Sequence, residues 1–441
     1  MKRKLTSLFS IPVLAAMLLQ SGISCFAEPL PPEIEEGTYG VLEYNLVDSQ
    51  YIVITGCGEG VTEFEIPIEI EGYPVVQIEA SNFSSTTLTA ITVEEGHESF
   101  SSVDGVLFDK SKKILYRYPF GKGEAYTIPE GTLYIENGAF MGVDSEGTVN
   151  TTLTEIVFPE SLLKIGYYAF SGCCGLTSVT FPDACTYLGP FAFSDCMSLE
   201  SVSFGKSLGA FQSTTFQNCP MLAELTVNNS RYLSVKDGVL YSKDGKTLEL
   251  YPPAKEDAVY TVPDGVTRIR GGAFSHCNSL EEVIFPESLE DLDGTTFFHC
   301  PLIKSITIPE GTTSMSTICN HCESFETLYL PSTIDFVDFS AIRNCTDAVD
   351  VYYNGSKAMW ENVDNSQWLS KTHTVHYREI SISGDLSGND SIDVMDCILL
   401  QKYLLGRYKA DANQYTFADL NDDGIVNAFD LAILKSMLLL T

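Results

Sequence analysis

Two twelve-residue stretches near the C-terminal end place oxygen donors at the spacing that a hard cation requires. The first offers Asp385, Ser387, Asn389, Ser391, Asp393 and Asp396, and the second offers Asp419, Asn421, Asp423, Ile425, Asn427 and Asp430. The residue at the fourth donor place, Ser391 or Ile425, would supply its backbone carbonyl. A tight loop with these donors can give Ca²⁺ the roughly six to eight oxygen ligands that it takes. The sequence therefore predicts two Ca²⁺ sites.

The two loops are not equivalent. Gly424 stands at the sixth position of the second loop, where a loop of the EF-hand type turns with a positive φ. In the first loop Asp390 stands at that position, and Ser387 and Asn389 also depart from the usual ligands. We therefore expect the second loop to bind Ca²⁺ more tightly than the first.

Both loops belong to a duplicated unit. The residues from Asp385 onward align with those from Asp419 onward at a shift of 34, and each loop runs into an amphipathic helix. The pair resembles a type I dockerin from Gly384 to Leu440, with Asp at the twelfth loop position and no helix entering either loop. The resemblance implies a small all-α module, residues 381–441, that binds a cohesin domain on a scaffold protein in a cellulosome-like assembly.

The resemblance also places the partner-binding residues at loop positions 10 and 11, which begin each helix: Val394, Met395, Ala428 and Phe429. These side chains have no hydroxyl to donate, so we expect Met395 and Phe429 to act as apolar anchors. The alternative is that they pack between the two helices. Because the two pairs differ, we expect one preferred docking mode, led by Phe429.

A repeat with a period of 23 residues fills the middle of the chain. Leucines, phenylalanines and cysteines recur in register, among them Leu153, Leu176, Leu199, Phe170, Phe193, Phe216, Cys173, Cys196 and Cys219. Each unit reads as a short strand, a Pro or Gly break and a second apolar cluster. One unit cannot bury its own apolar face, so stacked units must bury it together. The pattern predicts a β-solenoid of about twelve rungs, a rung being one turn of the chain.

Two longer steps carry the same insert, at residues 102–119 and 234–252. Each has an Asp-Gly pair at its start and a polar turn between two alternating apolar runs, which predicts a β-hairpin. With these inserts the region from Gly37 to Tyr377 resembles the BspA-like leucine-rich-repeat family, which implies a solenoid over residues 37–378 and protein or surface binding. Trp360 and Trp368 at its end are expected to cap the last rung; the alternative is a carbohydrate-stacking pair.

The recurring cysteines are expected to form a buried ladder of thiols, with disulfides between rungs as the alternative. Cys319 and Cys322 form a lone Cys-x-x-Cys pair, which supports a zinc site only weakly. His276, His299 and His321 each precede a ladder cysteine and should stack about 5 Å apart outside the core. They are either solvated loop residues or an opportunistic zinc or nickel site.

Composition and the first residues bound the function. The chain has 59 acidic against 26 basic residues and a net charge of −33, which argues against nucleic acid and anionic membranes as partners. Residues 1–27 read as a signal peptide, with a lipid anchor at Cys25 as the alternative. No second apolar run approaches the length of a membrane span. We therefore expect a secreted protein, extracellular or held at the cell surface through a scaffold.

The expected function is a non-catalytic binding or adhesion module docked onto a cohesin-bearing scaffold through Ca²⁺. Its solenoid would grip an unknown protein or cell-wall ligand. The alternative is a carbohydrate-active enzyme subunit of the same assembly with an unrecognised active site. Signal, repeats, cap and dockerin leave no domain-sized segment for catalysis, so we expect no enzyme.

Overall fold

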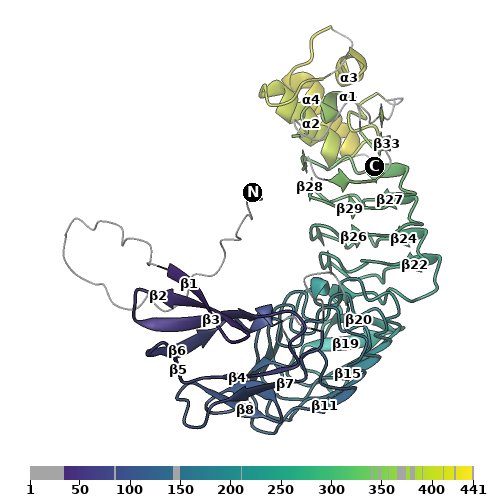
Figure 1. Ribbon diagram of the computed structural model, residues 1–441. Coiled ribbons are helices and arrows are strands. Elements are labelled where there is room, and N and C mark those ends of the chain that lie inside the picture. The colour runs from purple at the N-terminus through teal and green to yellow at the C-terminus, as the bar shows by residue number, and fades with distance from the viewer. Residues whose placement is uncertain are drawn as a thin grey trace.

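The computed structural model describes most of the chain from Ile34 onward: residues 34–83, 86–142, 149–209, 211–338, 341–345, 349–355, 357–364, 374–377, 383–389, 391–410, 412–421 and 424–439. The expected signal peptide, Cys25, Trp368, Asp390 and Asp423 lie outside these residues. Described elements form three parts in chain order: a small sheet, a long β-solenoid and a helical module (Figure 1).

The first part is a mixed five-stranded sheet that the repeat pattern did not predict. Its order is β1-β2-β3-β6-β5, with β3 parallel to β6 and the other pairs antiparallel. Ile52 and Ile54 of β3 are buried together with Phe83 and with Phe64 and Ile91 of the first rungs. The sheet thus covers the open N-terminal face of the stack. Its strands are β1 (Ile34–Tyr39), β2 (Leu42–Val47), β3 (Tyr51–Cys57), β5 (Glu69–Ile70) and β6 (Tyr73–Ile78).

The solenoid confirms the predicted fold, with one rung more than the twelve counted in the sequence. Within the described residues thirteen strands open successive rungs, and the additional one is β34. Adjacent strands are parallel and in register where they pair, as Val179, Val202 and Leu225 illustrate. The stack follows a curve in Figure 1. The strands are β4 (Glu63–Ile66), β7 (Ala90–Val93), β11 (Ala125–Thr127), β13 (Glu155–Val157), β15 (Ser178–Thr180), β17 (Ser201–Phe204), β18 (Glu224–Val227), β22 (Val259–Thr261), β24 (Glu282–Ile284), β27 (Ser305–Thr307), β30 (Thr327–Leu330), β33 (Asp350–Tyr353) and β34 (Thr374–Tyr377).

Short strands and 3-10 turns complete many rungs after the Pro or Gly break. Two-residue strands pair in parallel with their counterparts in the next rung. They are β12 (Tyr134–Ile135), β14 (Lys164–Ile165), β16 (Tyr187–Leu188), β23 (Arg268–Ile269), β25 (Asp291–Leu292), β26 (Phe297–Phe298), β28 (Ser314–Met315), β29 (Cys319–Asn320), β31 (Phe336–Val337) and β32 (Ile342–Arg343), with 3-10 turns η1 (Ala80–Asn82) and η2 (Ser213–Phe216).

Each insert contains the predicted hairpin and one further strand. In the first, β8 (Phe100–Val103), β9 (Val106–Asp109) and β10 (Ile114–Arg117) form an antiparallel meander. The second repeats it with β19 (Leu233–Lys236), β20 (Val239–Ser242) and β21 (Thr247–Leu250). The last strand of each meander then pairs in parallel with a solenoid strand, β10 with β12 and β21 with β23. The inserts therefore widen the solenoid.

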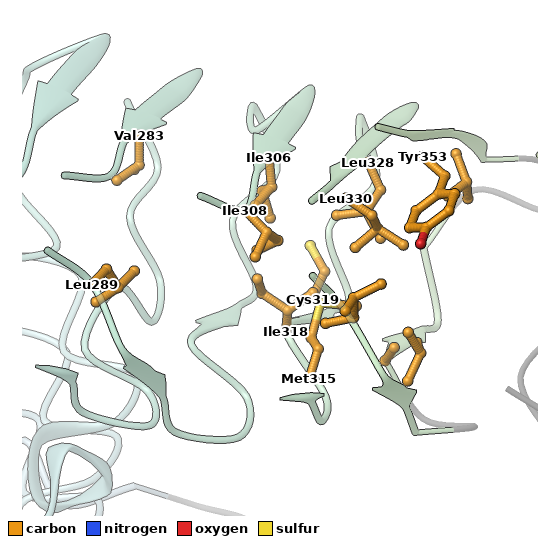
Figure 2. Packing of buried hydrophobic residues seen from close by; sticks show 14 of the residues in the cluster. Val283, Leu289, Ile306, Ile308, Met315, Ile318, Cys319, Leu328, Leu330 and Tyr353 are labelled. Carbon is orange, nitrogen blue, oxygen red and sulfur yellow. The ribbon is translucent and has the colours of Figure 1, made fainter. Parts of the chain in front are cut away.

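Aromatic rings and thiols form two ladders inside the stack. Phe170 stacks on Phe193 with ring centroids 4.9 Å apart, and Phe193 on Phe216 at 5.7 Å. In several rungs the thiol of the ladder cysteine donates to the carbonyl of a phenylalanine one rung earlier, for example Cys219 Sγ to Phe193 O at 3.1 Å and Cys300 Sγ to Phe274 O at 2.8 Å. All twelve cysteines of the described residues are free thiols, as the ladder interpretation expected. Figure 2 shows the interior of later rungs, where Ile306, Leu328 and Tyr353 point inward from successive strands.

The C-terminal end of the stack is closed by a buried tryptophan and the helical module. Trp360, in helix α1 (Lys357–Trp360), is 3% exposed and lies 5.1 Å from the Tyr353 ring, which fits a cap and leaves no face for a sugar. The module contains α2 (Val394–Leu404), α3 (Ala412–Ala418) and α4 (Ala428–Leu438). Helix α3 corrects one expectation, because it directly precedes the second loop, for which no entering helix was predicted.

Candidate calcium-binding and docking site

The first acidic loop folds around Asp385. This side chain is buried, and its Oδ1 accepts hydrogen bonds from the backbone N–H groups of Gly388 at 2.7 Å and Asn389 at 3.1 Å. The hydroxyl of Ser387 donates to the same oxygen at 3.2 Å. Gly388, at the fourth position of the loop, has a positive φ of 73°. Ser391 donates to Asn389 Oδ1 from both its N–H and its hydroxyl.

Asp393 and Asp396 join this loop to helix α2. Asp393 caps the helix by accepting from Met395 N at 2.6 Å, and its other oxygen accepts from Asn389 Nδ2 at 2.7 Å. Asp396 accepts from Ser387 N and Asp393 N, both at 2.7 Å, which completes a capping box. Burial raises the pKa of the Asp396 carboxyl to about 6, although these hydrogen bonds oppose the shift.

The second loop repeats this arrangement. Asp419 Oδ2 accepts from Gly424 N at 2.7 Å, and Gly424 has a φ of 78°, as its sixth position requires. Asp430 is fully buried and accepts from Leu420 N and Asn427 N at 2.8 Å, and Asn427 caps α4 through Phe429 N. The Ile425 carbonyl accepts from Asn427 Nδ2, while Asn421 lies exposed on the loop.

Helix α3 holds the two loops together, a role that no sequence signal indicated. Gln414 is fully buried and donates from Nε2 to Leu386 O at 2.9 Å. Tyr415 donates its hydroxyl to Gly424 O at 3.2 Å. Between the loop helices, Leu400 and Leu434 are completely buried and form the centre of the module. The loops are therefore fixed to one another and to α2 and α4.

The donor set fits Ca²⁺. Every predicted side-chain ligand in the described residues offers oxygen, and the site contains the buried carboxyls Asp385, Asp396 and Asp430. Burial disfavours the charged form of Asp396, so a cation beside it would remove that cost. Among described residues, the loop carboxylates do not form a group whose oxygens all lie within 4.8 Å of one another. Ca²⁺ would have to exchange some N–H···O bonds of the loop for metal bonds.

The four predicted docking residues differ in accessibility. Phe429 is 73% exposed and Val394 67% exposed, and Ala428 is also exposed. Met395 is only partly exposed and packs against the cluster that includes the end of the solenoid. The alternative that these residues pack between the two helices thus fails for Phe429.

Two further clusters lie on the solenoid. His276, His299 and His321 stack as expected, with ring centroids 5.3 and 4.5 Å apart. His299 is exposed, as a solvated loop residue would be, whereas His276 and His321 are half-buried. No set of ring nitrogens, one from each of these described histidines, has all its pairwise distances within 4.8 Å. The stack therefore offers no three-ligand metal site. A trio of thiols does meet this distance: Cys319, Cys322 and Cys345.

An open groove of about 500 Å³ lies on the outer face of the last rungs. Its floor is a ladder of half-exposed rings, in which Tyr352 stacks on Tyr329 at 5.1 Å and on His376 at 4.5 Å. Glu310 and Asn354 add polar groups at its edge, joined by a hydrogen bond of 2.7 Å. The ring faces cover one another, so the ladder presents mainly ring edges to a ligand.

Comparison with protein families finds matches for the repeat region and for the helical module. Residues 148–250 and 258–362 match the BspA type leucine-rich-repeat region in six copies. Residues 383–439 match the type I dockerin domain. The chain is a BspA-type leucine-rich-repeat protein with a C-terminal type I dockerin. Neither family is a catalytic domain, and dockerins of this type bind Ca²⁺ and cohesin domains.

Solved structures show similar repeats at low sequence identity. A leucine-rich cell surface protein of Faecalibacterium prausnitzii is 23% identical, with a TM-score of 0.46, over 76% of this chain and 98% of its own. A leucine-rich-repeat protein of Eubacterium ventriosum is 21% identical, with a TM-score of 0.48, over 72% of this chain and 77% of its own. No curated protein matches the chain. No helix of the described residues is long and apolar enough to cross a bilayer.

Proposed function

We propose that this dockerin protein is an exported, non-catalytic binding subunit that docks onto a cohesin-bearing scaffold through two Ca²⁺-loaded loops. The observation that carries the proposal is the duplicated loop-helix unit of residues 383–439, which matches the type I dockerin. Ca²⁺ would be held by Asp385, Ser387, Asn389, Ser391, Asp393 and Asp396 in the first loop and by Asp419, Asn421, Asp423, Ile425, Asn427 and Asp430 in the second. When bound, the ion supplies charge that fixes both loops; it takes no part in a reaction.

The docking contacts are assigned to Val394, Met395, Ala428 and Phe429. Phe429 has the properties of an interface anchor, because it is an aromatic side chain held out to solvent by a capped helix. Calorimetric titration of the purified chain with type I cohesins, in Ca²⁺ and in EDTA, tests this function. Binding in Ca²⁺ that disappears in EDTA is expected, while the absence of binding to every cohesin in Ca²⁺ would contradict it.

We assign ligand binding to the solenoid, with a protein or a cell-wall component as the ligand. Support comes from the repeat family and from the groove that contains Tyr329 and Tyr352, which exposes a mixed apolar and acidic surface. Pull-down against plant cell-wall fractions and surface proteins, with Tyr352→Ala as the comparison, tests this part. Retention of wild-type protein and loss with the variant are expected; equal behaviour would exclude the groove as the contact.

The alternative of a carbohydrate-active enzyme receives no support from the matched families. The expected result is that pure protein releases no sugars from cell-wall polysaccharides beyond a heat-denatured control. Reproducible release that one carboxylate substitution abolishes would favour the enzyme.

A further inference from the structure

The two equivalent faces of the duplicated module have different surroundings in this chain. At the repeat shift of 34, five outward positions of α2 correspond to five positions at and after α4. The α2 set is Met395, Ile398, Gln401, Lys402 and Leu405, and the corresponding set is Phe429, Ala432, Lys435, Ser436 and Leu439. A symmetrical dockerin would offer both sets to a partner.

The α2 set faces the protein's own solenoid. All five of its residues line a space of about 450 Å³, and Ser332, Ile334 and Asp335 of the solenoid lie in the opposite wall. Beside this space the contact is closed, because Leu399 and Tyr408 are each 5% exposed and belong to one buried cluster with Met359 and Trp360. Figure 1 shows the yellow helices resting on the last green rungs.

The corresponding α4 set has nothing over it in the described part of the chain. All five residues are exposed, Phe429 at 73% and Leu439 at 87%. In the α2 set Met395 is half-buried, and the other four residues are exposed only toward or beside the space that the solenoid bounds, Leu405 at 62%. Two large apolar side chains at the ends of one helix, with Lys435 between them, present an anchor at each end and a cation in the middle. A partner with an apolar surface and an acidic group would complement this face.

We propose that the solenoid end seats the dockerin through its α2 face, so that a cohesin can bind only through the α4 face. This rests on the proposed docking function and restricts it. A cohesin covering Met395 and Leu405 would have to enter the space of about 450 Å³ between α2 and the last rungs, which is too small for a protein domain. The dockerin thus has one fixed orientation relative to the solenoid. The groove beside Tyr352 would therefore always face the same direction relative to the bound scaffold.

The proposed contact between the α2 face and the solenoid end, here called the seat, is tested by measuring the affinities of full-length variants for one cohesin in Ca²⁺. Phe429→Ala should weaken binding by about thirtyfold or more, as loss of an interface anchor does, and Met395→Ala by less than about threefold. In the Phe429→Ala background, Met359→Arg places a charge in the seat and should restore part of the affinity by freeing α2. Hydrogen exchange should show that Met359→Arg deprotects the segment around Leu399.

The contact between α2 and the solenoid and the docking of a cohesin can fail separately. Equal losses from Phe429→Ala and Met395→Ala would overturn the seat while leaving cohesin docking intact. So would deprotection around Leu399 without any recovery of affinity. If wild-type protein binds no cohesin at all, the docking function itself is wrong.

A second, independent inference concerns the three thiols. Cys319 pairs with Phe297 of the preceding rung, so it occupies the place of a ladder phenylalanine and points into the core, as Figure 2 shows. Cys322 holds the ladder place of the same rung, and Cys345 holds that of the next. Cys319 and Cys322 are completely buried, Cys345 is partly exposed, and all three Sγ atoms lie within 4.8 Å of one another.

Three thiolates around one ion at a bond length of about 2.3 Å stand about 4 Å apart, so small side-chain movements would close this site. We propose that Cys319, Cys322 and Cys345 bind one thiophilic d¹⁰ cation, Zn²⁺ or Cu⁺. Thiolates select such ions over Ca²⁺ and Mg²⁺. Three S–H bonds break, their protons pass to solvent, and three sulfur–metal bonds form without any redox change. The partly exposed Cys345 marks the side of entry.

Zinc titration of reduced, Ca²⁺-saturated full-length protein against a chromophoric chelator tests this site. About one tightly bound Zn²⁺ per chain is expected, with loss in Cys345→Ser and retention in Cys57→Ser, which removes another partly exposed thiol. His299→Asn should also retain the ion. Equal zinc content in wild type and Cys345→Ser, or mass spectrometry of the isolated protein showing a disulfide within the trio, would overturn the proposal.

Discussion

One backbone position in each rung explains which residues precede the ladder cysteines. Asp195, Asn218 and Asn344 have φ values of 59°, 56° and 50°, and His276 and His299 have 60° and 52°. Asn, Asp and His are the non-glycine residues that adopt this left-handed conformation most readily. The histidine stack therefore follows from backbone geometry repeated at the solenoid spacing, and it needs no metal to explain it.

His276 should make the solenoid sensitive to acid. Burial, aided by the neighbouring His299, lowers its pKa from 6.5 to about 4. The unfolded chain therefore binds a proton between pH 6.5 and about 4 that the folded chain does not, so this stabilisation is complete above pH 6.5 and disappears as the pH falls to about 4. His276→Asn should remove about 1 kcal/mol of that loss, after allowance for solvent screening. Urea unfolding across this pH range measures it; parallel wild-type and variant curves would contradict it.

The two Ca²⁺ loops should differ in affinity. The second has Gly424, with a φ of 78°, at its sixth position, where the sequence of the first has Asp390, and a left-handed backbone costs an aspartate more than a glycine. We expect calorimetry to show two binding events, with Asp419→Ala removing the tighter and Asp385→Ala the weaker. Because ion binding and folding are coupled, EDTA should lower the helix content of the wild type. Loss of the tighter event in Asp385→Ala would reverse the assignment.

At the scale of the element, the phenylalanine ladder should carry much of the solenoid's stability. Phe193 is fully buried between Phe170 and Phe216. Phe193→Ala leaves a cavity that close-packed rungs cannot refill, so we expect a loss of about 3–5 kcal/mol in unfolding free energy. Phe193→Leu should cost less, and Met197→Ala, at a 43% exposed position of the same rung, should change little. Similar melting temperatures for Phe193→Ala and Met197→Ala would show that the ladder is not a stabilising element.

The elements that can be predicted from the sequence are those with a period. Leu176, Phe193 and Cys196 recur at the same place in successive turns, so their spacing alone locates the rungs and the inward face. The calcium loops are predictable in the same way, because the cation dictates the spacing of Asp419 and Asp430.

Elements that occur only once could not be predicted, because no recurring spacing marks them in the sequence. The sheet of β1–β3 occurs once in the chain. Helix α3 is short, and its sequence has no equivalent before the first loop, so no repeat in the sequence reveals it. The approach of Cys345 to Cys319 depends on the stacking of two rungs, which the lone Cys-x-x-Cys pair could not reveal. The α2 seat likewise depends on how two domains meet, and nothing in the spacing of Met395 differs from that of Phe429.

At the scale of the whole molecule, a long solenoid and a small docking module are joined end to end. The buried cluster that begins around Val239 in the middle of the stack continues through Tyr353 and Trp360 into Leu399 and Leu400 of the dockerin. The solenoid's last rung thus uses the dockerin as part of its cover. A ligand held along the rungs and a scaffold bound at α4 would be carried by one continuous body (Figure 1).

The most direct test of Ca²⁺-dependent docking is calorimetric titration of the full-length protein with a panel of type I cohesins, with Ca²⁺ and then with EDTA. We predict saturable binding of about one cohesin per chain in Ca²⁺, complete loss of binding in EDTA, and a large loss in Phe429→Ala, because the anchor stands on a calcium-fixed loop. Folded, Ca²⁺-saturated protein that binds no cohesin, or binding that survives EDTA, would contradict it.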